Sequence, residues 1–325
     1  MTRPKIVCLG GGTGTYTVLR GLRHRDVELT AVVSMADSGG SSGRLRDEFG
    51  VLPPGDVRRC LLALAADDET NQTLRQLFEY RFDKGQGLNG HSFGNLFITA
   101  LTEICGRTDQ AIIEASRILR IKGQVLPVAL ADTHLWAQLD DGTLIKGENH
   151  IDVRTTKPEV KISRVFLEPE AEVYAPVARE IAQADLIVIG PGDLYTSVIP
   201  TLLPRGVAKA ISRSAAKKVY VCNLMTKHGE TDDFAASDFV REVLRYLEPD
   251  EEPVRRLLDA VIINKSTLPQ QLLAKYTAEG AQVVQADEEN CRGLVPQVIF
   301  ANVSSATTLF RHDPGKLAEV LMNVI

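Results

Sequence analysis

The sequence lacks the features that would place a chain in a membrane or lead it out of the cell. None of its apolar runs approaches the ~18 consecutive residues that a membrane-spanning helix needs. The first residues lead directly into a short apolar segment, without the longer apolar region of a signal peptide. We therefore expect a cytoplasmic protein with no membrane span.

Paired cysteines are also missing. The five cysteines are scattered, with no Cys-x-x-Cys pair and no histidine beside them at the spacing of a metal site. Isolated thiols in apolar segments indicate buried side chains in a reducing compartment, so we predict no disulfide framework and no metal ligands.

An excess of positive charge is the third feature that the chain lacks. The formal net charge is -5, whereas proteins that bind nucleic acid through its phosphates carry clustered lysine and arginine. We therefore expect no nucleic-acid partner. A small-molecule ligand fits this composition better.

Short apolar runs that end in glycine or polar residues alternate with longer amphipathic segments. Such alternation predicts an α/β protein with a Rossmann-like, doubly wound and mostly parallel sheet. Expected strands occupy 5–9, 29–34, 186–189, 219–223 and 261–264. Expected helices occupy 16–22, 57–66, 70–78, 97–104, 109–119, 175–183 and 234–247.

The alternation breaks in the middle of the chain. Between about 124 and 167, short alternating runs are separated by turn signals, which predicts a β-rich excursion of hairpins at one sheet edge. No low-complexity linker and no internal repeat divides the chain. We therefore interpret 1–325 as a single composite domain.

A glycine-rich loop follows the first expected strand and opens a helix. Gly11, Gly12, Thr13 and Gly14 belong to it. Glycines let backbone amides approach an anion at a helix N-terminus, so the loop indicates phosphate binding, although a tight strand-to-helix turn would look the same. It matches neither the G-x-G-x-x-G dinucleotide fingerprint nor the Walker A pattern.

A second polar segment follows the next expected strand. Asp37 stands where dinucleotide-binding folds place the acid that binds a ribose hydroxyl. A run of serine and glycine comes next, with Ser41, Ser42 and Arg44, which suits a polyanion or a polar ring. Read without its neighbours, the run also fits a mobile solvent loop.

Four further segments complete the pattern. In the first of them, Asp56 is expected to cap a helix that carries two arginines in its first turn. The others contribute His91 and Asn95 before an apolar helix, Gly190, Gly192 and Asp193 after a buried strand, and Asn223 and Thr226 after another. Loops at the carboxyl ends of parallel strands share one edge of the sheet, so we predict a common phosphate-binding crevice there.

These six segments, in this order, resemble those of the YvcK-like gluconeogenesis factors, relatives of 2-phospho-L-lactate transferase (CofD). The resemblance covers the chain from its first strand to its last helix. It implies a Rossmann-like protein that binds UDP-N-acetylglucosamine and supports gluconeogenic growth, cell shape and envelope homeostasis. It also implies sugar-nucleotide contacts at Tyr276 and Arg311, where the tyrosine would stack on uracil and the arginine would bind the diphosphate.

Two alternative functions stay open. One is transfer of a phosphate-linked group from a nucleotide diphosphate, as in CofD, with Asp37 orienting the acceptor and Mg²⁺ offsetting the diphosphate charge. The other is NAD binding, because Asp37 lies about 20 residues beyond the glycine loop, as in dinucleotide folds. No nucleophile–base pair identifies a catalytic residue. The sequence also leaves open regulatory protein partners and a homo-oligomer.

Overall fold

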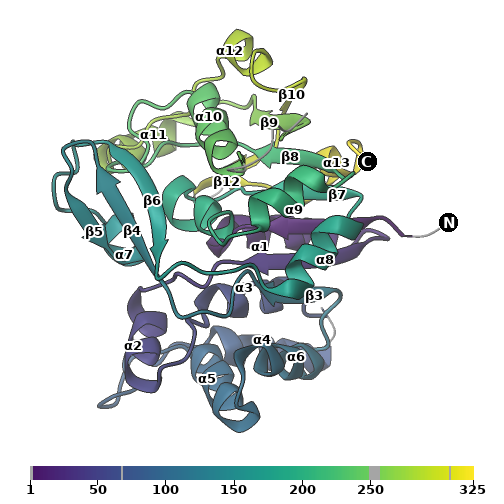
Figure 1. Ribbon diagram of the computed structural model, residues 1–325, viewed down its shortest axis with the longest axis vertical. Coiled ribbons are helices and arrows are strands. Elements are labelled where there is room, and N and C mark those ends of the chain that lie inside the picture. The colour runs from purple at the N-terminus through teal and green to yellow at the C-terminus, as the bar shows by residue number, and fades with distance from the viewer. Residues whose placement is uncertain (1–2, 67–68, 249–256, 307–308) are drawn as a thin grey trace.

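A seven-stranded parallel sheet forms the centre of the molecule (Figure 1). The structure is a computed structural model and describes residues 3–66, 69–248, 257–306 and 309–325. The strand order is β10-β9-β8-β7-β1-β2-β3. The strands are β1 (Lys5–Leu9), β2 (Glu28–Val33), β3 (Gln124–Pro127), β7 (Leu186–Ile189), β8 (Lys217–Val221), β9 (Ala260–Asn264) and β10 (Gln297–Ala301).

Both faces of this sheet are buried, which explains why its strands read as continuous apolar runs. In β1, Ile6 and Cys8 face one core, and Val7 and Leu9 face the other. The first core is completed by α1 (Gly12–Leu22), α3 (Gly55–Leu64), α5 (Phe93–Cys105), α6 (Thr108–Ile118) and α13 (Pro314–Met322). The second is completed by α8 (Ala175–Gln183), α9 (Val207–Arg213) and α10 (Ala236–Leu247). The predicted doubly wound α/β fold is thereby confirmed.

The middle of the chain forms a separate antiparallel sheet, which stands at the left of Figure 1. It consists of β4 (His134–Leu139), β5 (Leu144–Lys146) and β6 (Ile162–Glu168), with α7 (Glu148–Asp152) between β5 and β6. The predicted excursion therefore exists, but it begins later than expected and forms a sheet of its own, so the expected position at an edge of the central sheet is wrong. The segment Gln124–Pro127 is instead β3, which pairs in parallel with β2 at the edge of the central sheet.

Several elements differ from the sequence-based prediction. The serine- and glycine-rich run is not a loop, because it begins helix α2 (Gly40–Phe49). The prediction also missed β10, α11 (Gln270–Ala278), α12 (Glu288–Arg292) and the hairpin of β11 (Ser304–Ala306) and β12 (Phe310–His312). Helix α4 (Glu69–Glu79) lies where a helix was expected. None of the described helices is long and apolar enough to cross a bilayer.

The strand order reverses beside β1. From β1 the chain moves outward to β2 and β3, then returns to the other side of β1 with β7 and continues outward to β10. Ligands of open α/β sheets bind at such a switch point, outside the carboxyl ends of the strands. The segments that follow β1 and β7 are the two glycine loops identified in the sequence.

Candidate functional site

Two adjoining cavities open at the switch point. The larger, here called the main cleft, has a volume of about 500 Å³, and the smaller, the side pocket, about 310 Å³. Both are lined by Thr13, Gly14, Gly192, Asp193 and Arg311. The main cleft adds Gly11, Gly12, Asp37, Ser41, Ser42 and Asn95 from the predicted site, and the side pocket adds Asn223 and Tyr276.

The N-terminus of α1 lies where the two cavities meet. Gly12 begins the helix at φ +63°, and a Cβ at Gly14 would lie 2.0 Å from the carbonyl oxygen of Pro191 in the turn after β7. Glycine is thus required for the two loops to approach each other. The N-cap residue of α1, Gly11, has no side chain to cap the first turn, and Thr13 and Gly14 line both cavities, so the positive end of the helix dipole lies at the cavities.

Asp56 closes part of this helix end. Its Oδ1 accepts a hydrogen bond from the Gly12 amide at 2.8 Å, so it binds α1 and does not cap its own helix. The prediction that Asp56 is the N-cap of the following helix is wrong, since α3 begins at Gly55 with Pro54 before it. Burial, together with the nearby charge of Asp37, raises the pKa of Asp56 to about 6.

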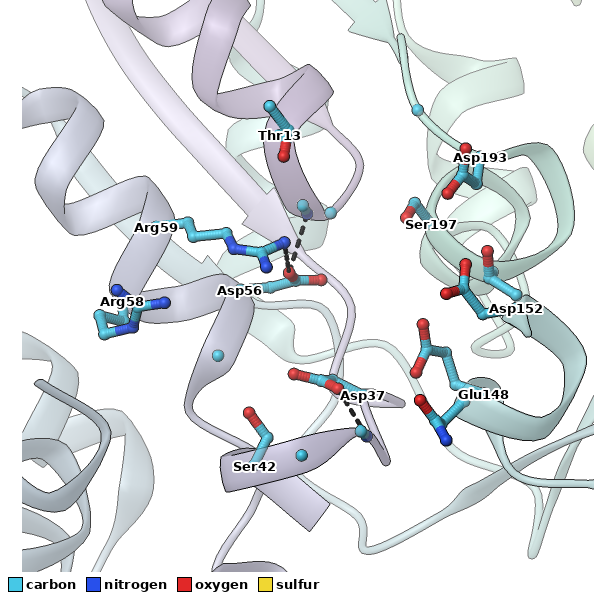
Figure 2. Close-up of a pocket in the computed structure, with 18 of the residues that line it drawn as sticks. Thr13, Asp37, Ser42, Asp56, Arg58, Arg59, Glu148, Asp152, Asp193 and Ser197 are labelled. Carbon is cyan, nitrogen blue, oxygen red and sulfur yellow. Dashed lines mark hydrogen bonds and ion pairs between the residues drawn. The ribbon is translucent and has the colours of Figure 1, made fainter. Parts of the chain in front are cut away.

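Asp37 lies near Asp56 in the main cleft, beside the start of α2 (Figure 2). Its Oδ1 accepts a hydrogen bond from the Gly39 amide at 2.9 Å, which shapes the turn into the helix. Ser41 and Ser42 follow in the first turn of α2, and both accept hydrogen bonds from the Asn95 amide group, at 3.1 and 3.4 Å. A buried polar floor thus lies beneath the cleft.

The two walls of the main cleft carry opposite charge. Figure 2 shows Arg58 and Arg59 on one side and Glu148, Asp152 and Asp193 on the other. The arginines come from α3, whereas the acids come from α7 and from the loop after β7. The cleft can therefore bind an anionic group on one wall and hydroxyl or cationic groups on the other.

A lysine neutralises part of the acidic wall. Asp152, Asp193 and Glu230 each offer a carboxylate oxygen within 4.8 Å of the others, as in a metal site. However, Lys227 forms ion pairs with all three, at 2.9 Å to both Asp193 and Glu230. Burial opposes the charge of Lys227, but the three acids outweigh burial and raise its pKa. Because the ammonium group fills the position of a cation, this cluster does not fit a bound metal ion.

Glu148 is the other unusual acid of this wall. Burial, with the charges of Asp37 and Asp152, raises its pKa to about 8. Glu148 is consequently mostly protonated at neutral pH and can donate a hydrogen bond as well as accept one.

The side pocket is less polar. Leu224, Met225 and Phe310 contribute apolar surface, and Tyr276 from α11 lies among them. The Tyr276 hydroxyl accepts a hydrogen bond from the Phe310 amide at 2.9 Å, which holds α11 against β12. Arg311 is exposed, and its guanidinium group has no hydrogen-bond or ion-pair partner among the described residues.

Four predicted site residues line neither cavity. Arg44 donates to the carbonyl oxygen of Asn89, and His91 is buried behind Ser41, whose hydroxyl lies 3.0 Å from its Nδ1. Thr226 is buried and accepts a hydrogen bond from the Gln282 amide. Gly190 lies at the base of the turn, where its amide donates to the carbonyl oxygen of Leu9 in β1.

Sequence reasoning assigned no ligand role to several lining residues. They are Asp56, Arg58, Arg59, Arg81, Glu148, Asn149, Asp152, Thr196 and Ser197. The arginine pair early in α3 did give a signal in the sequence, because positive charge that opposes the helix dipole indicates a bound anion, although a surface-facing pair without a ligand fits equally well. The residues of α7 offered no such signal, since only the insertion of the small sheet brings them to the cleft.

Known proteins match this chain over nearly its full length. Residues 6–304 match the family described as "2-phospho-L-lactate transferase CofD". The chain is 45% identical over 322 residues to a "Putative gluconeogenesis factor" of Nostoc, with 98% of this chain and 68% of that protein covered. It is 40% identical to the "Gluconeogenesis factor" of Bacillus subtilis, with 99% and 98% covered.

A solved structure shows the same fold. The crystal structure of a UPF0052 family member from Bacillus halodurans superposes with a TM-score of 0.91 at 39% identity, with 99% of each chain covered. Family, relatives and structure all extend over nearly the full chain. The chain therefore belongs to the CofD family and, within it, to the group of the gluconeogenesis factors.

Proposed function

We propose that this protein is a regulator that binds UDP-N-acetylglucosamine and links gluconeogenic growth to cell shape and envelope homeostasis. One observation carries the proposal. A partly apolar pocket and a polar cleft meet at the N-terminus of α1, where Asp56 caps only the Gly12 amide, and both are lined by Arg311, whose side chain has no partner in the described part of the chain. A nucleoside diphosphate sugar has three matching parts: a base for the partly apolar pocket, a diphosphate for the helix N-terminus and Arg311, and a sugar for the polar cleft.

The ligand is proposed to lie across the two cavities. Tyr276 would stack on the uracil in the side pocket. The amides of Thr13 and Gly14, with Arg311, would bind the diphosphate at the junction. The sugar would then extend into the main cleft, where Asp37 and Glu148 can hydrogen-bond its hydroxyl and amide groups.

Isothermal titration calorimetry tests this assignment. We expect saturable binding of UDP-N-acetylglucosamine, weaker binding of UDP, and weaker binding still of NAD, each measured with and without Mg²⁺. Arg311→Gln should weaken UDP-sugar binding by about tenfold, the effect of one lost charge-assisted hydrogen bond. Arg117→Gln, at an exposed arginine of α6 paired with Glu114, is the matched control. Absence of UDP-sugar binding, or NAD binding tighter than that of the UDP-sugar, would contradict the proposal.

The regulatory role needs a cellular test. A Bacillus subtilis strain without its own gluconeogenesis factor would receive this chain or its Arg311→Gln variant. We expect the unmodified chain to restore growth on a gluconeogenic carbon source and normal cell shape. Equal rescue by the variant would show that nucleotide-sugar binding is not what the cell uses.

A second candidate function is group transfer from a nucleotide diphosphate donor. It is favoured by Asp56, whose pKa of about 6 leaves a carboxylate at neutral pH beside the loop proposed to hold the diphosphate. Asp37 would orient the acceptor hydroxyl. The hydroxyl oxygen of the acceptor would form a bond to the β-phosphorus of the donor, while the bond between that phosphorus and the oxygen of the departing nucleoside monophosphate breaks. The proton of the acceptor hydroxyl would pass to Asp56.

Mass spectrometry separates the two functions. Donors built on UDP and GDP would be incubated with acceptor alcohols, with and without Mg²⁺, which would offset the diphosphate charge when bound to the donor. Release of nucleoside monophosphate that stops in Asp56→Asn would support transfer. Intact donor after long incubation, despite measured binding, would leave the regulatory role alone.

A further inference from the structure

Three arginines gather on one wall of the main cleft, away from the side pocket. Arg58 and Arg59 lie in the first turns of α3. Arg81 lies in the segment before α5, where a β-bridge joins it to Ser92, the N-cap of that helix. All three line the main cleft, and none lines the side pocket.

Arg58 is the most buried of the three. Its side chain is only 9% exposed, and it donates from Nε to Asn95 Oδ1 at 2.9 Å and from Nη1 to the carbonyl oxygen of Phe78 at 3.3 Å. Both acceptors are neutral. Among the described residues no carboxylate forms an ion pair with Arg58, although a charge this deeply buried is costly without one.

The neighbours of Arg58 increase this cost. Burial first, and then the positive charges of Arg59 and Arg81, lower the pKa of Arg58 to about 10. Glu79 and Asp37 act in the opposite direction without forming an ion pair with it in the described structure. Arg59 is paired only loosely, at 3.8 Å from Asp56.

The surrounding groups are also donors. Helix α2 starts at the same cleft without a side-chain cap, and the hydroxyls of Ser41 and Ser42 lie in its first turn. Asn95 connects this turn to Arg58, because its amide donates to both serines while its oxygen accepts from the guanidinium. The wall is thus a preorganised set of donors, beside which the Asp56 carboxylate is bonded to the Gly12 amide and lies 3.8 Å from Arg59.

We propose that Arg58, Arg59 and Arg81 form a second anion subsite, which takes the phosphate group of a small phosphorylated metabolite. The guanidinium groups would supply the paired N–H donors that suit phosphate oxygens. This subsite adds to the proposed function, because the nucleotide sugar would use Arg311 and the side pocket while the metabolite occupies the arginine wall. The protein would then respond to two ligands at one cleft.

Titration with inorganic phosphate tests the subsite, in chloride buffer at constant ionic strength. Phosphate is added to the free protein and to protein saturated with UDP-N-acetylglucosamine. We expect phosphate to bind in both states. Arg81→Gln should weaken phosphate binding by about tenfold while UDP-sugar affinity changes by less than about twofold. Arg311→Gln should give the opposite result.

Two further variants serve as controls for this titration. Arg44→Gln is the matched control, since Arg44 lies in α2, is bonded to Asn89, and lines neither cavity. Arg58→Lys keeps the charge of the buried position but removes the planar fork, so we expect weaker phosphate binding in a protein that still folds, as judged by circular dichroism.

Other outcomes separate this proposal from the proposed function. Phosphate that UDP-N-acetylglucosamine displaces one for one, and that is lost in Arg311→Gln but not in Arg81→Gln, would show a single anion site. Absence of phosphate binding in both states would also overturn the subsite. If the UDP-sugar fails to bind while phosphate binding still depends on Arg81, the result supports the anion subsite and contradicts the proposed function.

Discussion

At the scale of single residues, Asp56 is the side chain that joins two helices at the cleft. Its carboxylate accepts from the first amide of α1 while lying in the first turn of α3. Its pKa in the folded protein is about 6, against an ordinary value of 3.8. The folded state therefore keeps a proton at pH values where the unfolded chain has already released it.

This difference predicts a pH-dependent stability. The contribution of Asp56 is fully present below about pH 4, falls as the pH rises to about 6, and changes no further above that. Two pKa units correspond to about 3 kcal/mol. Asp56→Asn keeps an oxygen for the Gly12 amide but cannot titrate. Urea unfolding between pH 4 and pH 7 should therefore show the wild-type advantage over the variant shrinking with pH, and a constant difference would contradict the assigned pKa.

Lys227 carries a second residue-scale prediction. Its ammonium group serves three acids, of which Glu230 is fully buried. Lys227→Ala should lower the free energy of unfolding by about 1–3 kcal/mol, because it leaves the acids to repel one another. It should also create an oxygen-lined site, so that Mg²⁺ or Ca²⁺ raises the melting temperature of the variant.

The control for this prediction is Lys209→Ala, at an exposed lysine of α9. Neither divalent cation should stabilise that variant or the wild-type protein at this position. A Lys227→Ala variant whose melting temperature is equally insensitive to the metals would show that the three carboxylates do not form the proposed arrangement.

At the scale of elements, the close approach of α1 to the turn after β7 creates the junction of the two cavities. A methyl group at Gly14 would overlap the backbone of Pro191, and backbone cannot rotate away as a side chain can. We expect Gly14→Ala to destabilise the fold by about 2–4 kcal/mol and to weaken UDP-sugar binding. Gly315→Ala is the control, because a Cβ there makes only an ordinary contact, 3.4 Å from Asp313. Equal melting temperatures for the two variants would contradict the assigned packing.

The elements also show what sequence can and cannot predict. The strands β1 and β7 were predicted residue for residue, because a strand buried on both faces is a continuous apolar run. Helix α2 was missed because its first residues are glycine and serine, which have low helix propensity. Its burial of Leu45 and Arg46 supplies the tertiary contacts that override propensity.

The candidate site likewise contains residues that the sequence predicts and residues that it does not. The glycine loops and Asp37 follow strand ends, so the rule of the parallel sheet places them together. Glu148 and Asp152 reach the cleft through α7, which lies within an antiparallel insertion whose orientation no local pattern specifies. Arg81 comes from an irregular segment, whose position no local sequence pattern specifies either.

At the scale of the whole molecule, the small sheet shares a core with the central sheet. Leu135 of β4 and Val165 of β6 belong to the same buried cluster as Ile187 of β7 and Val240 of α10. The Tyr246 hydroxyl of α10 also accepts a hydrogen bond from the Val165 amide. An insertion joined in this way has no separate core to unfold on its own.

We therefore predict a single cooperative unfolding transition for the chain. Leu135→Ala, at a side chain that is fully buried, should lower the free energy of unfolding by about 2–5 kcal/mol and shift the entire transition. Leu144→Ala is the matched control, since that leucine lies in β5 of the same small sheet but is 53% exposed. Differential scanning calorimetry measures whether the chain unfolds in one transition or in two. Two separate transitions, of which Leu135→Ala shifts only one, would show that the small sheet is an independent domain and that the acidic wall can detach from the arginine wall.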